Sequence, residues 1–288
     1  MFNEMKSEIN SFLLNYFKNK GTFNKIIYDS ASYSLNIGGK RIRPLLMLLT
    51  YNMYKNNWKD IIEFSAAIEM IHTYSLIHDD LPCMDNDDLR RGKPTNHKVY
   101  GEDIAVLAGD TLLNEAMNLM MKFSLKHGEE ALMAAQKIAE ASGPERMIGG
   151  QVVDIINEGK KISEEELKYM HMKKTGALIN VSIISGAILA NAPKEDINLL
   201  EKFGEKLGLA FQIKDDILDV IGSTEKLGKN VLSDKENDKT NFITMHGLDY
   251  CIKECEKLTN ESIKILDSLS VDTEALKFLT KKLLDREN

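Results

Sequence analysis

The sequence has few of the residues that crosslink a chain or form the tight turns of a sheet. It contains 3 Cys, 5 Pro and 18 Gly in 288 residues. So few turn-forming residues argue against an all-β fold, in which many short strands are joined by Gly- and Pro-rich turns. A small, odd number of cysteines argues against a disulfide framework and indicates a reducing compartment, so we expect a cytoplasmic protein.

Positively charged residues are fewer than negatively charged ones. Lys and Arg number 37 against 44 Asp and Glu, which gives a formal net charge of −7. A negatively charged chain repels polyanions, and general nucleic-acid binding is therefore disfavoured. Residues 1–20 include Glu4 and Glu8 and contain no long apolar run, so no signal peptide is expected there.

A single stretch, between Lys174 and Lys194, lacks charge over nearly the length that a bilayer-spanning helix needs. It contains several polar residues, among them Asn180 and Ser185, and it ends at Pro193. A buried helix at the centre of a large bundle is therefore favoured over a membrane span.

Helical spacing dominates the rest of the chain. The five prolines mark the edges of long segments in which apolar residues recur every three or four positions, as in Ile61, Phe64, Ile68 and Ile71. No run alternates with period two for long enough to predict a strand. We therefore predict an all-α fold of about ten helices, forming one domain over residues 1–288. Loops are expected at 21–22, 36–41, 82–101, 143–144, 157–163 and 222–241.

Two acidic clusters lie at the end of, or within, apolar helices. Asp79 and Asp80 end one predicted helix, and Asp215, Asp216 and Asp219 lie inside another. Gathered like charges cost free energy unless a cation binds them, and oxygen ligands suit hard divalent cations. No His/Cys set has zinc spacing. The alternative is that each cluster is a solvated surface patch. That explanation would be favoured for a single cluster, but two clusters make it less favourable.

Basic segments alternate with these acidic clusters along the sequence. They are Gly38–Pro44, Leu89–Pro94 and Lys173–Gly176, and Lys229 and Lys239 follow the second cluster. A Gly-rich turn before a helix, together with Lys and Arg, forms an anion site. The alternation favours binding of a metal–diphosphate complex over a merely solvated basic face.

In their order and spacing, these motifs resemble the trans-isoprenyl diphosphate synthase family, most of all its bacterial farnesyl diphosphate synthase branch. The resemblance covers residues 30–240, and the four residues between Asp80 and Asp85 are the longer form of the first motif typical of that branch. The matching segments are Gly38–Pro44, His72–His78, Asp79–Asp85, Leu89–Pro94, Gly149–Gln151, Lys174–Gly176, Phe211–Gln212 and Asp215–Asp219.

The resemblance implies a helical bundle around a central cavity and a homodimer. It implies head-to-tail transfer of a prenyl group from an allylic diphosphate to isopentenyl diphosphate, giving mainly farnesyl diphosphate. The allylic diphosphate ionises, the double bond of isopentenyl diphosphate attacks the cation, and a proton is lost. Mg²⁺ is the implied cofactor, with about three ions per site.

The resemblance also implies residue roles. The main metal ligands would be Asp79, Asp85 and Asp215, and Asp80, Asp216 and Asp219 would assist or hold metal-bound water. Allylic diphosphate would be bound by Arg90, Lys174 and Lys229. Isopentenyl diphosphate would be bound by Lys40, Arg43, His72 and Arg91. Oxygens near the developing cation would come from Thr175 and Gln212.

Two positions carry alternatives. Tyr74 precedes Asp79 by five residues, where a large aromatic in the family resembles a floor that stops growth near fifteen carbons; the alternative is a core tyrosine. Lys239 would be a further substrate ligand, but the family's hydroxyl residue and Tyr-Pro are replaced after it by Thr240–Ile243, so a surface lysine is equally compatible.

Competing functions share parts of this pattern. A geranyl or geranylgeranyl diphosphate synthase of the same family differs only in product length. A class I terpene cyclase has a different second metal site, and a non-catalytic regulatory subunit commonly loses an aspartate motif. A phosphohydrolase would need more His ligands than the His78–Asp79 pair.

Overall fold

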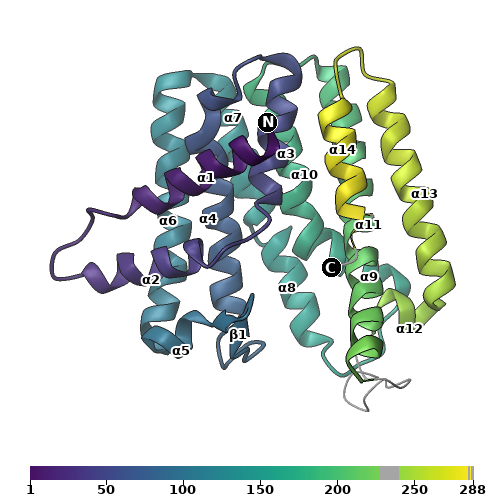
Figure 1. The fold of residues 1–288 in the computed structure, drawn as a ribbon, viewed down its shortest axis with the longest axis horizontal. Coiled ribbons are helices and arrows are strands. Elements are labelled where there is room, and N and C mark those ends of the chain that lie inside the picture. Colours follow the sequence, from purple (N-terminus) through teal and green to yellow (C-terminus); the bar gives the residue numbers. More distant parts are fainter. Residues whose placement is uncertain (228–239, 285, 287–288) are drawn as a thin grey trace. The chain divides into compact units, whose positions relative to one another are not determined.

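The computed structural model describes residues 1–227, 240–284 and 286, and these are almost entirely helical (Figure 1). The all-α prediction is confirmed. The described chain forms two compact units: Met1–Ala139 with Ser185–Asn191, and Glu140–Ile184 with Ala192–Asn288. Among the described residues, no helix has both the length and the apolar character needed to cross a membrane.

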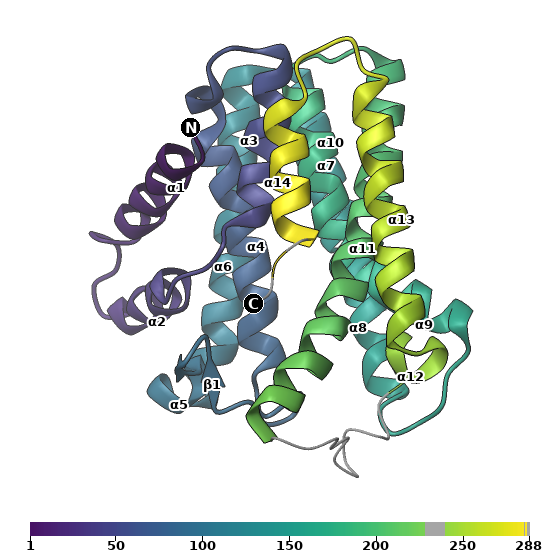
Figure 2. The ribbon, with the colours of Figure 1, turned by 45° about the vertical axis from the view of Figure 1, so that its right-hand side comes forward.

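The first unit is built around one long apolar helix. Its elements are α1 (Phe2–Tyr16), α2 (Lys25–Asn36), α3 (Ile42–Tyr54), the 3₁₀ turn η1 (Trp58–Ile61), α4 (Ile62–Asp79), β1 (Leu89–Arg90), β2 (Lys93–Pro94), α5 (Asn96–Tyr100), α6 (Glu102–His127) and most of α7 (Glu129–Ser142). Helix α4 packs along α6 (Figure 2) and also contacts α1, α2 and α3. Residues on all sides of α4 are therefore buried, including Phe64, Ile68 and Ile71.

The second unit is built around the longest helix of the chain. Its elements are α8 (Met147–Ile156), α9 (Glu164–His171), the π turn η2 (Met172–Gly176), the first part of α10 (Ala177–Leu189), α11 (Lys194–Leu227), α12 (Phe242–His246), α13 (Leu248–Asp267) and α14 (Glu274–Leu284). Helix α13 packs along α11. Cys251 and Cys255 of α13 are buried free thiols.

Helix α10 is the uncharged stretch that was tested as a membrane span. It is buried nearly all round, and its polar residues are accommodated within the protein: the Ser182 hydroxyl donates to the Leu178 carbonyl at 2.6 Å. Gly186 lies so close to α3 that a Cβ there would sit 2.4 Å from the Met47 carbonyl oxygen. Close backbone packing therefore explains the small residues of this segment.

The segment 82–101 was predicted as a loop, but it contains one short hairpin and the short helix α5. Strands β1 and β2 pair antiparallel, with Leu89 opposite Pro94 and Arg90 opposite Lys93. The two residues between them, Arg91 and Gly92, have φ of 54° and 73°, the pattern of a tight two-residue hairpin turn. A pair of two-residue strands was too short for any periodicity to reveal it.

Candidate functional site

The first aspartate motif is a tight turn at the end of α4. Asp79 is the last helical residue, and its carbonyl accepts the Asp85 backbone N–H at 2.8 Å. Asn86 follows with a left-handed φ of 53° and donates its N–H to the Leu81 carbonyl. This folding-back brings the backbone at Asp85 next to Asp79, although the two are separated in sequence. The Asp79 side chain is half-buried and that of Asp85 is exposed.

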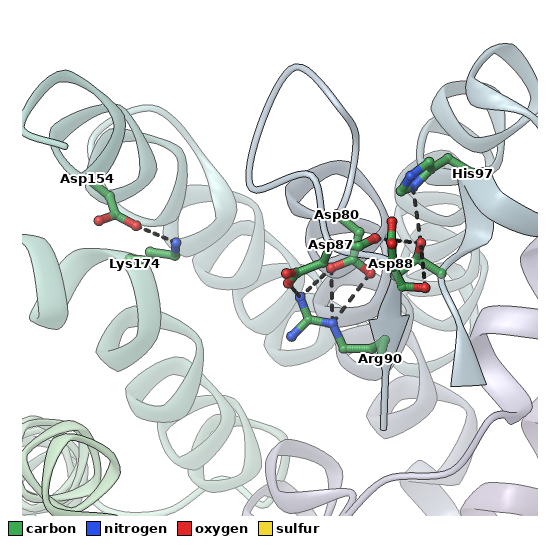
Figure 3. A network of polar contacts seen from close by, with 8 residues as sticks. Asp80, Asp87, Asp88, Arg90, His97, Asp154 and Lys174 are labelled. Carbon is green, nitrogen blue, oxygen red and sulfur yellow. Dashed lines mark hydrogen bonds and ion pairs between the residues drawn. The ribbon is translucent and has the colours of Figure 1, made fainter. Parts of the chain in front are cut away.

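Asp80, by contrast, is directed at a guanidinium. It is only 3 % exposed, and Arg90 of β1 donates from Nε to its Oδ1 at 3.0 Å and from Nη2 to the same oxygen (Figure 3). Arg90 also contacts Asp87 at 3.1 Å. Burial raises the pKa of Asp80, and Arg90 acts in the opposite direction. Asp80 and Arg90, predicted as a metal ligand and a diphosphate ligand, therefore pair with each other here.

The hairpin that carries Arg90 is anchored at both ends. The Thr95 hydroxyl donates to the Asp87 carbonyl at 2.7 Å. Asn96, buried at the start of α5, donates to the Ser34 hydroxyl at 2.7 Å and accepts from the Ser30 hydroxyl at 2.8 Å. Because α2 holds the hairpin in this way, the positions of Arg90 and Arg91 are fixed by the fold.

The Gly38–Pro44 turn supplies further cations. Gly38 and Gly39 have φ of 107° and 146°, values that an L-residue rarely adopts. A Cβ on Gly39 would lie 2.7 Å from Nη1 of Arg91, and that nitrogen donates to the Gly38 carbonyl. Lys40 is exposed and Arg43 is half-buried. The two basic segments predicted to bind isopentenyl diphosphate therefore meet.

His72 lies among these cations. Burial lowers its pKa well below the usual value, and the positive charges of Arg43, Arg91, Arg41 and Arg90 lower it further. The imidazole is therefore neutral at physiological pH and keeps one N–H donor. Arginines gathered around a neutral histidine form a surrounding suited to an anion, and the binding roles of His72, Arg43 and Arg91 stay a prediction.

Arg41, however, is a structural residue. The sequence grouped it with Lys40 and Arg43 as a cation of the anion site, but it is only 3 % exposed. Its Nη1 donates to Glu69 at 2.8 Å, its Nε to Asn10 at 2.9 Å and its Nη2 to the Leu35 carbonyl at 2.6 Å. Its contribution is to fix the start of α3, where it adopts a φ of 55°.

Tyr74 is part of the same helix as Asp79. It is 7 % exposed, and its ring meets that of His78 edge-on at 5.8 Å between centroids. Burial, with a smaller contribution from Asp79, raises the pKa of Tyr74 to about 12. The phenol is thus a neutral, fixed and bulky group near the first aspartate motif.

The second aspartate motif lies on α11, and its three carboxylates have different surroundings. Asp215 is half-buried and Asp219 is exposed, one turn apart on the same helix face. Asp215 pairs with Arg286, whose guanidinium lies 4.2 Å from the Phe211 ring centroid. Asp216 is 6 % exposed and accepts the Phe242 backbone N–H at 3.0 Å. Burial is the main cause that raises its pKa to about 6.

Apart from Arg90, the residues predicted to act on the allylic substrate belong to the second unit, and some of them lie outside its described part. Lys174 and Thr175 lie in η2, and the Lys174 ammonium donates to Asp154 Oδ2 at 2.6 Å (Figure 3). Gln212 is half-buried and hydrogen bonds to Asp216. Lys229 and Lys239 lie outside the described residues.

Sequence reasoning did not identify Asp154 or Arg286. Asp154 follows Gln151 of the matched Gly149–Gln151 segment by three residues, which was the available signal. For Arg286, nothing in the local pattern indicated a partner on α11.

The donor set fits Mg²⁺. Asp79 and Asp85 in the first unit, and Asp215 and Asp219 in the second, offer only oxygen atoms, and cationic side chains lie beside each pair. Among residues 1–227, 240–284 and 286, no three Asp, Glu, His or Cys side chains are already grouped as a metal site.

Comparison with known proteins identifies a family and several relatives. Residues 24–279 match the polyprenyl synthetase family model. The chain is 50 % identical to farnesyl diphosphate synthase of Bacillus subtilis over 238 residues, covering 80 % of each chain. It is 43 % identical to geranylgeranyl diphosphate synthase of Cyanophora paradoxa over 238 residues, covering 82 % of this chain and 79 % of the other.

Solved structures agree with the sequence relatives. The crystal structure of a geranyltransferase from Legionella pneumophila is similar with a TM-score of 0.88 at 30 % identity, covering 100 % of this chain and 96 % of that one. Two aspartate motifs, each beside its own cations, occur here on an all-α fold of that type. The chain therefore belongs to the polyprenyl synthetase family.

Proposed function

We infer that the chain is a Mg²⁺-dependent farnesyl diphosphate synthase. It condenses isopentenyl diphosphate head-to-tail with dimethylallyl or geranyl diphosphate and releases diphosphate. The observation that carries this inference is the arginine cluster around neutral His72, on the same helix as the half-buried Asp79. A reaction with two diphosphates requires such an anion site beside metal-binding carboxylates.

In the first unit, isopentenyl diphosphate is bound by Lys40, Arg43, His72 and Arg91. Arginine presents several N–H donors in a planar fork that matches phosphate oxygens. His72 adds a donor that does not depend on protonation in the physiological range. Because Arg41 and Glu69 neutralise each other inside the protein, the excess charge near the turn belongs to the side chains that bind substrate.

The carboxylates of Asp79, Asp85, Asp215 and Asp219 would hold Mg²⁺. When bound, Mg²⁺ would stabilise the negative charge that develops on the departing diphosphate. Asp80 assists indirectly because it accepts a hydrogen bond from Arg90. Asp216 assists indirectly because it accepts the backbone N–H of Phe242.

The diphosphate of the allylic substrate is bound by Arg90, Lys174 and Lys229, and Lys239 is a further substrate ligand. The allylic C–O bond breaks heterolytically, leaving an allylic cation and diphosphate. Thr175 and Gln212 place oxygen atoms near that cation and stabilise it. The double bond of isopentenyl diphosphate then forms the new C–C bond, and a proton passes to the released diphosphate.

Tyr74 sets the length of the product. Its buried, neutral ring on α4 limits the space for the prenyl tail of the diphosphate held beside Asp79, so growth stops near fifteen carbons. The alternative is a geranyl or geranylgeranyl diphosphate synthase, and the similarity to the Cyanophora enzyme keeps it open. A non-catalytic subunit is disfavoured because both aspartate motifs are complete.

We further propose that residues 1–288 act as one polyprenyl synthetase domain, that two copies form a homodimer, and that the protein works in the cytoplasm. The free thiols of Cys83, Cys251 and Cys255 support a reducing location. Sedimentation equilibrium of the purified chain tests the dimer directly.

A product assay tests the proposed function. The purified chain is incubated with Mg²⁺, isopentenyl diphosphate and either dimethylallyl or geranyl diphosphate. We expect farnesyl diphosphate and one diphosphate per bond formed. A hydrocarbon product would indicate a cyclase, inorganic phosphate a hydrolase, and no product a regulatory subunit; each of these would overturn the proposal.

Two variants give the assay its internal control. Asp79→Asn removes a metal ligand and should lower kcat/KM by about 100-fold or more. Asp249→Asn changes an exposed carboxylate on α13 and should leave turnover within about twofold, since surface changes away from a site have small effects.

A further inference from the structure

The geometry around Lys174 fixes this residue at two points. The first is its backbone. Gly150 of α8 lies against η2 so closely that a Cβ on Gly150 would be 2.2 Å from the Lys174 nitrogen. Since no side chain larger than hydrogen fits there, α8 and the backbone of Lys174 are held together at van der Waals contact.

The second point is the ammonium group. Asp154 follows Gly150 by one helical turn, on the same face of α8. Its Oδ2 accepts from Lys174 Nζ at 2.6 Å, and the two side chains are only 17 % and 26 % exposed. Figure 3 shows the pair pointing toward each other from α8 and η2. A partly shielded ion pair of this kind is stronger than one in open solvent.

The π turn makes this arrangement specific. Residues Met172–Gly176 form η2, and π turns insert an extra residue that changes the direction of the following side chains. Lys174 lies in the middle of the turn, so its side chain direction does not follow the α-helical period of α9 or α10.

Free lysine side chains have four rotatable bonds, and ordering them on a ligand costs entropy. An ammonium group has three N–H donors. With one of them on Asp154, the position of the ammonium group is restrained before the ligand arrives.

We propose that Asp154 is a positioning residue for substrate binding: it holds the Lys174 ammonium in place for the allylic diphosphate. This rests on the proposed function, because the role of Lys174 as a diphosphate ligand belongs to it. Asp154 acts through Lys174 and does not touch the substrate. The competing explanation is that the ion pair only holds α8 to η2.

A double-mutant cycle separates the two explanations. The variants are Asp154→Asn, Lys174→Gln and the double variant, each assayed for KM and kcat with geranyl and isopentenyl diphosphates. We expect Asp154→Asn to raise KM for geranyl diphosphate about tenfold, the effect of losing one charge-assisted hydrogen bond. KM for isopentenyl diphosphate should change less than about twofold, and Asp154→Glu should restore part of the loss.

The decisive comparison is made in the Lys174→Gln background. There, Asp154→Asn should have no further effect on KM for geranyl diphosphate, because the ammonium group that Asp154 positions has been removed. Equal losses in both backgrounds, or a parallel rise in both KM values, would overturn the proposal. If Asp154→Asn does not fold, Asp154→Glu is carried through the same cycle.

A matched control comes from the same unit. Lys206 and Glu261 form an ion pair of the same length, 2.6 Å, between α11 and α13, with 34 % and 36 % exposure. Glu261→Gln should leave both KM values unchanged. An effect on KM for geranyl diphosphate as large as that of Asp154→Asn would show that loss of any ion pair in this unit suffices.

Calorimetric titration with inorganic diphosphate and Mg²⁺ keeps the test independent of turnover. If the wild-type chain makes no prenyl product, the proposed function fails, while diphosphate affinity still reports on the pair. If Asp154→Asn weakens diphosphate binding in the wild-type background but not in the Lys174→Gln background, the positioning role is supported. Unchanged diphosphate affinity in Asp154→Asn would overturn it.

Discussion

The buried pair of Arg41 and Glu69 permits a quantitative prediction. Both side chains are 2 % exposed, and they are 2.8 Å apart. Glu69→Ala removes the carboxylate that neutralises Arg41 and leaves the guanidinium bonded to Asn10 and the Leu35 carbonyl. Leaving one buried charge uncompensated costs about 3–5 kcal/mol, and a domain of this size should then melt on the order of 10 °C lower.

Two further variants locate the origin of that cost. Glu69→Gln keeps the shape and one hydrogen bond, so the loss should be smaller, about 1.5–3 kcal/mol. Replacing the pair by apolar residues, Arg41→Met with Glu69→Leu, should cost far less than the sum of the single changes, because no charge remains buried.

Urea and thermal unfolding followed by circular dichroism provide the measurement. The reasoning would be refuted if Glu69→Ala cost less than about 1 kcal/mol, or if the double variant were as unstable as the two single changes added together. The same double variant should raise KM for isopentenyl diphosphate, since Arg41 fixes the turn that carries Lys40 and Arg43.

Three other predictions concern Tyr74, His72 and the metal. Tyr74→Ala should give products longer than fifteen carbons in the product assay; unchanged chain length would refute the floor role. Because the folded-state pKa of His72 lies below its unfolded value of about 6.5, the unfolded chain binds a proton that the folded chain does not as pH falls through that range. The stabilisation is therefore present above about pH 6.5 and is lost on acidification, so the wild type should lose more unfolding free energy than His72→Gln between pH 7.5 and 5.5; equal losses would contradict this. Chelation by EDTA should abolish product formation, with full recovery on adding Mg²⁺, and activity that survives chelation would rule out the metal requirement.

Much of the fold followed from local pattern. Helical spacing and the scarcity of turn residues predicted an all-α chain, and polar residues such as Asn180 and Ser185 within the uncharged stretch predicted a buried helix, which α10 is. The shared face of Asp215 and Asp219 followed from their separation by four residues, because helix geometry alone determines it.

What the sequence left open depended on partners distant in the chain. Arg41, Lys40 and Arg43 are all positively charged residues of one turn, and the sequence does not distinguish their roles. Pairing with Glu69 on α4 makes Arg41 a buried structural residue. The π turn breaks the helical period at the residues that place Lys174, so no spacing rule could bring Lys174 to Asp154. Arg90 was predicted to bind substrate, and its pairing with Asp80 required a hairpin too short to be seen.

The contact between Asp216 and Phe242 has a consequence for the missing Tyr-Pro. Asn241 begins α12 with reciprocal hydrogen bonds to Thr244 at 2.8 and 2.9 Å, and Asp216 receives the next backbone N–H. At the positions where the family pattern has Tyr-Pro, the present chain holds the entry to α12 with polar side chains. The restraint at that point therefore comes from hydrogen bonds rather than from a proline ring, and replacing a single amide or carboxylate would remove part of it.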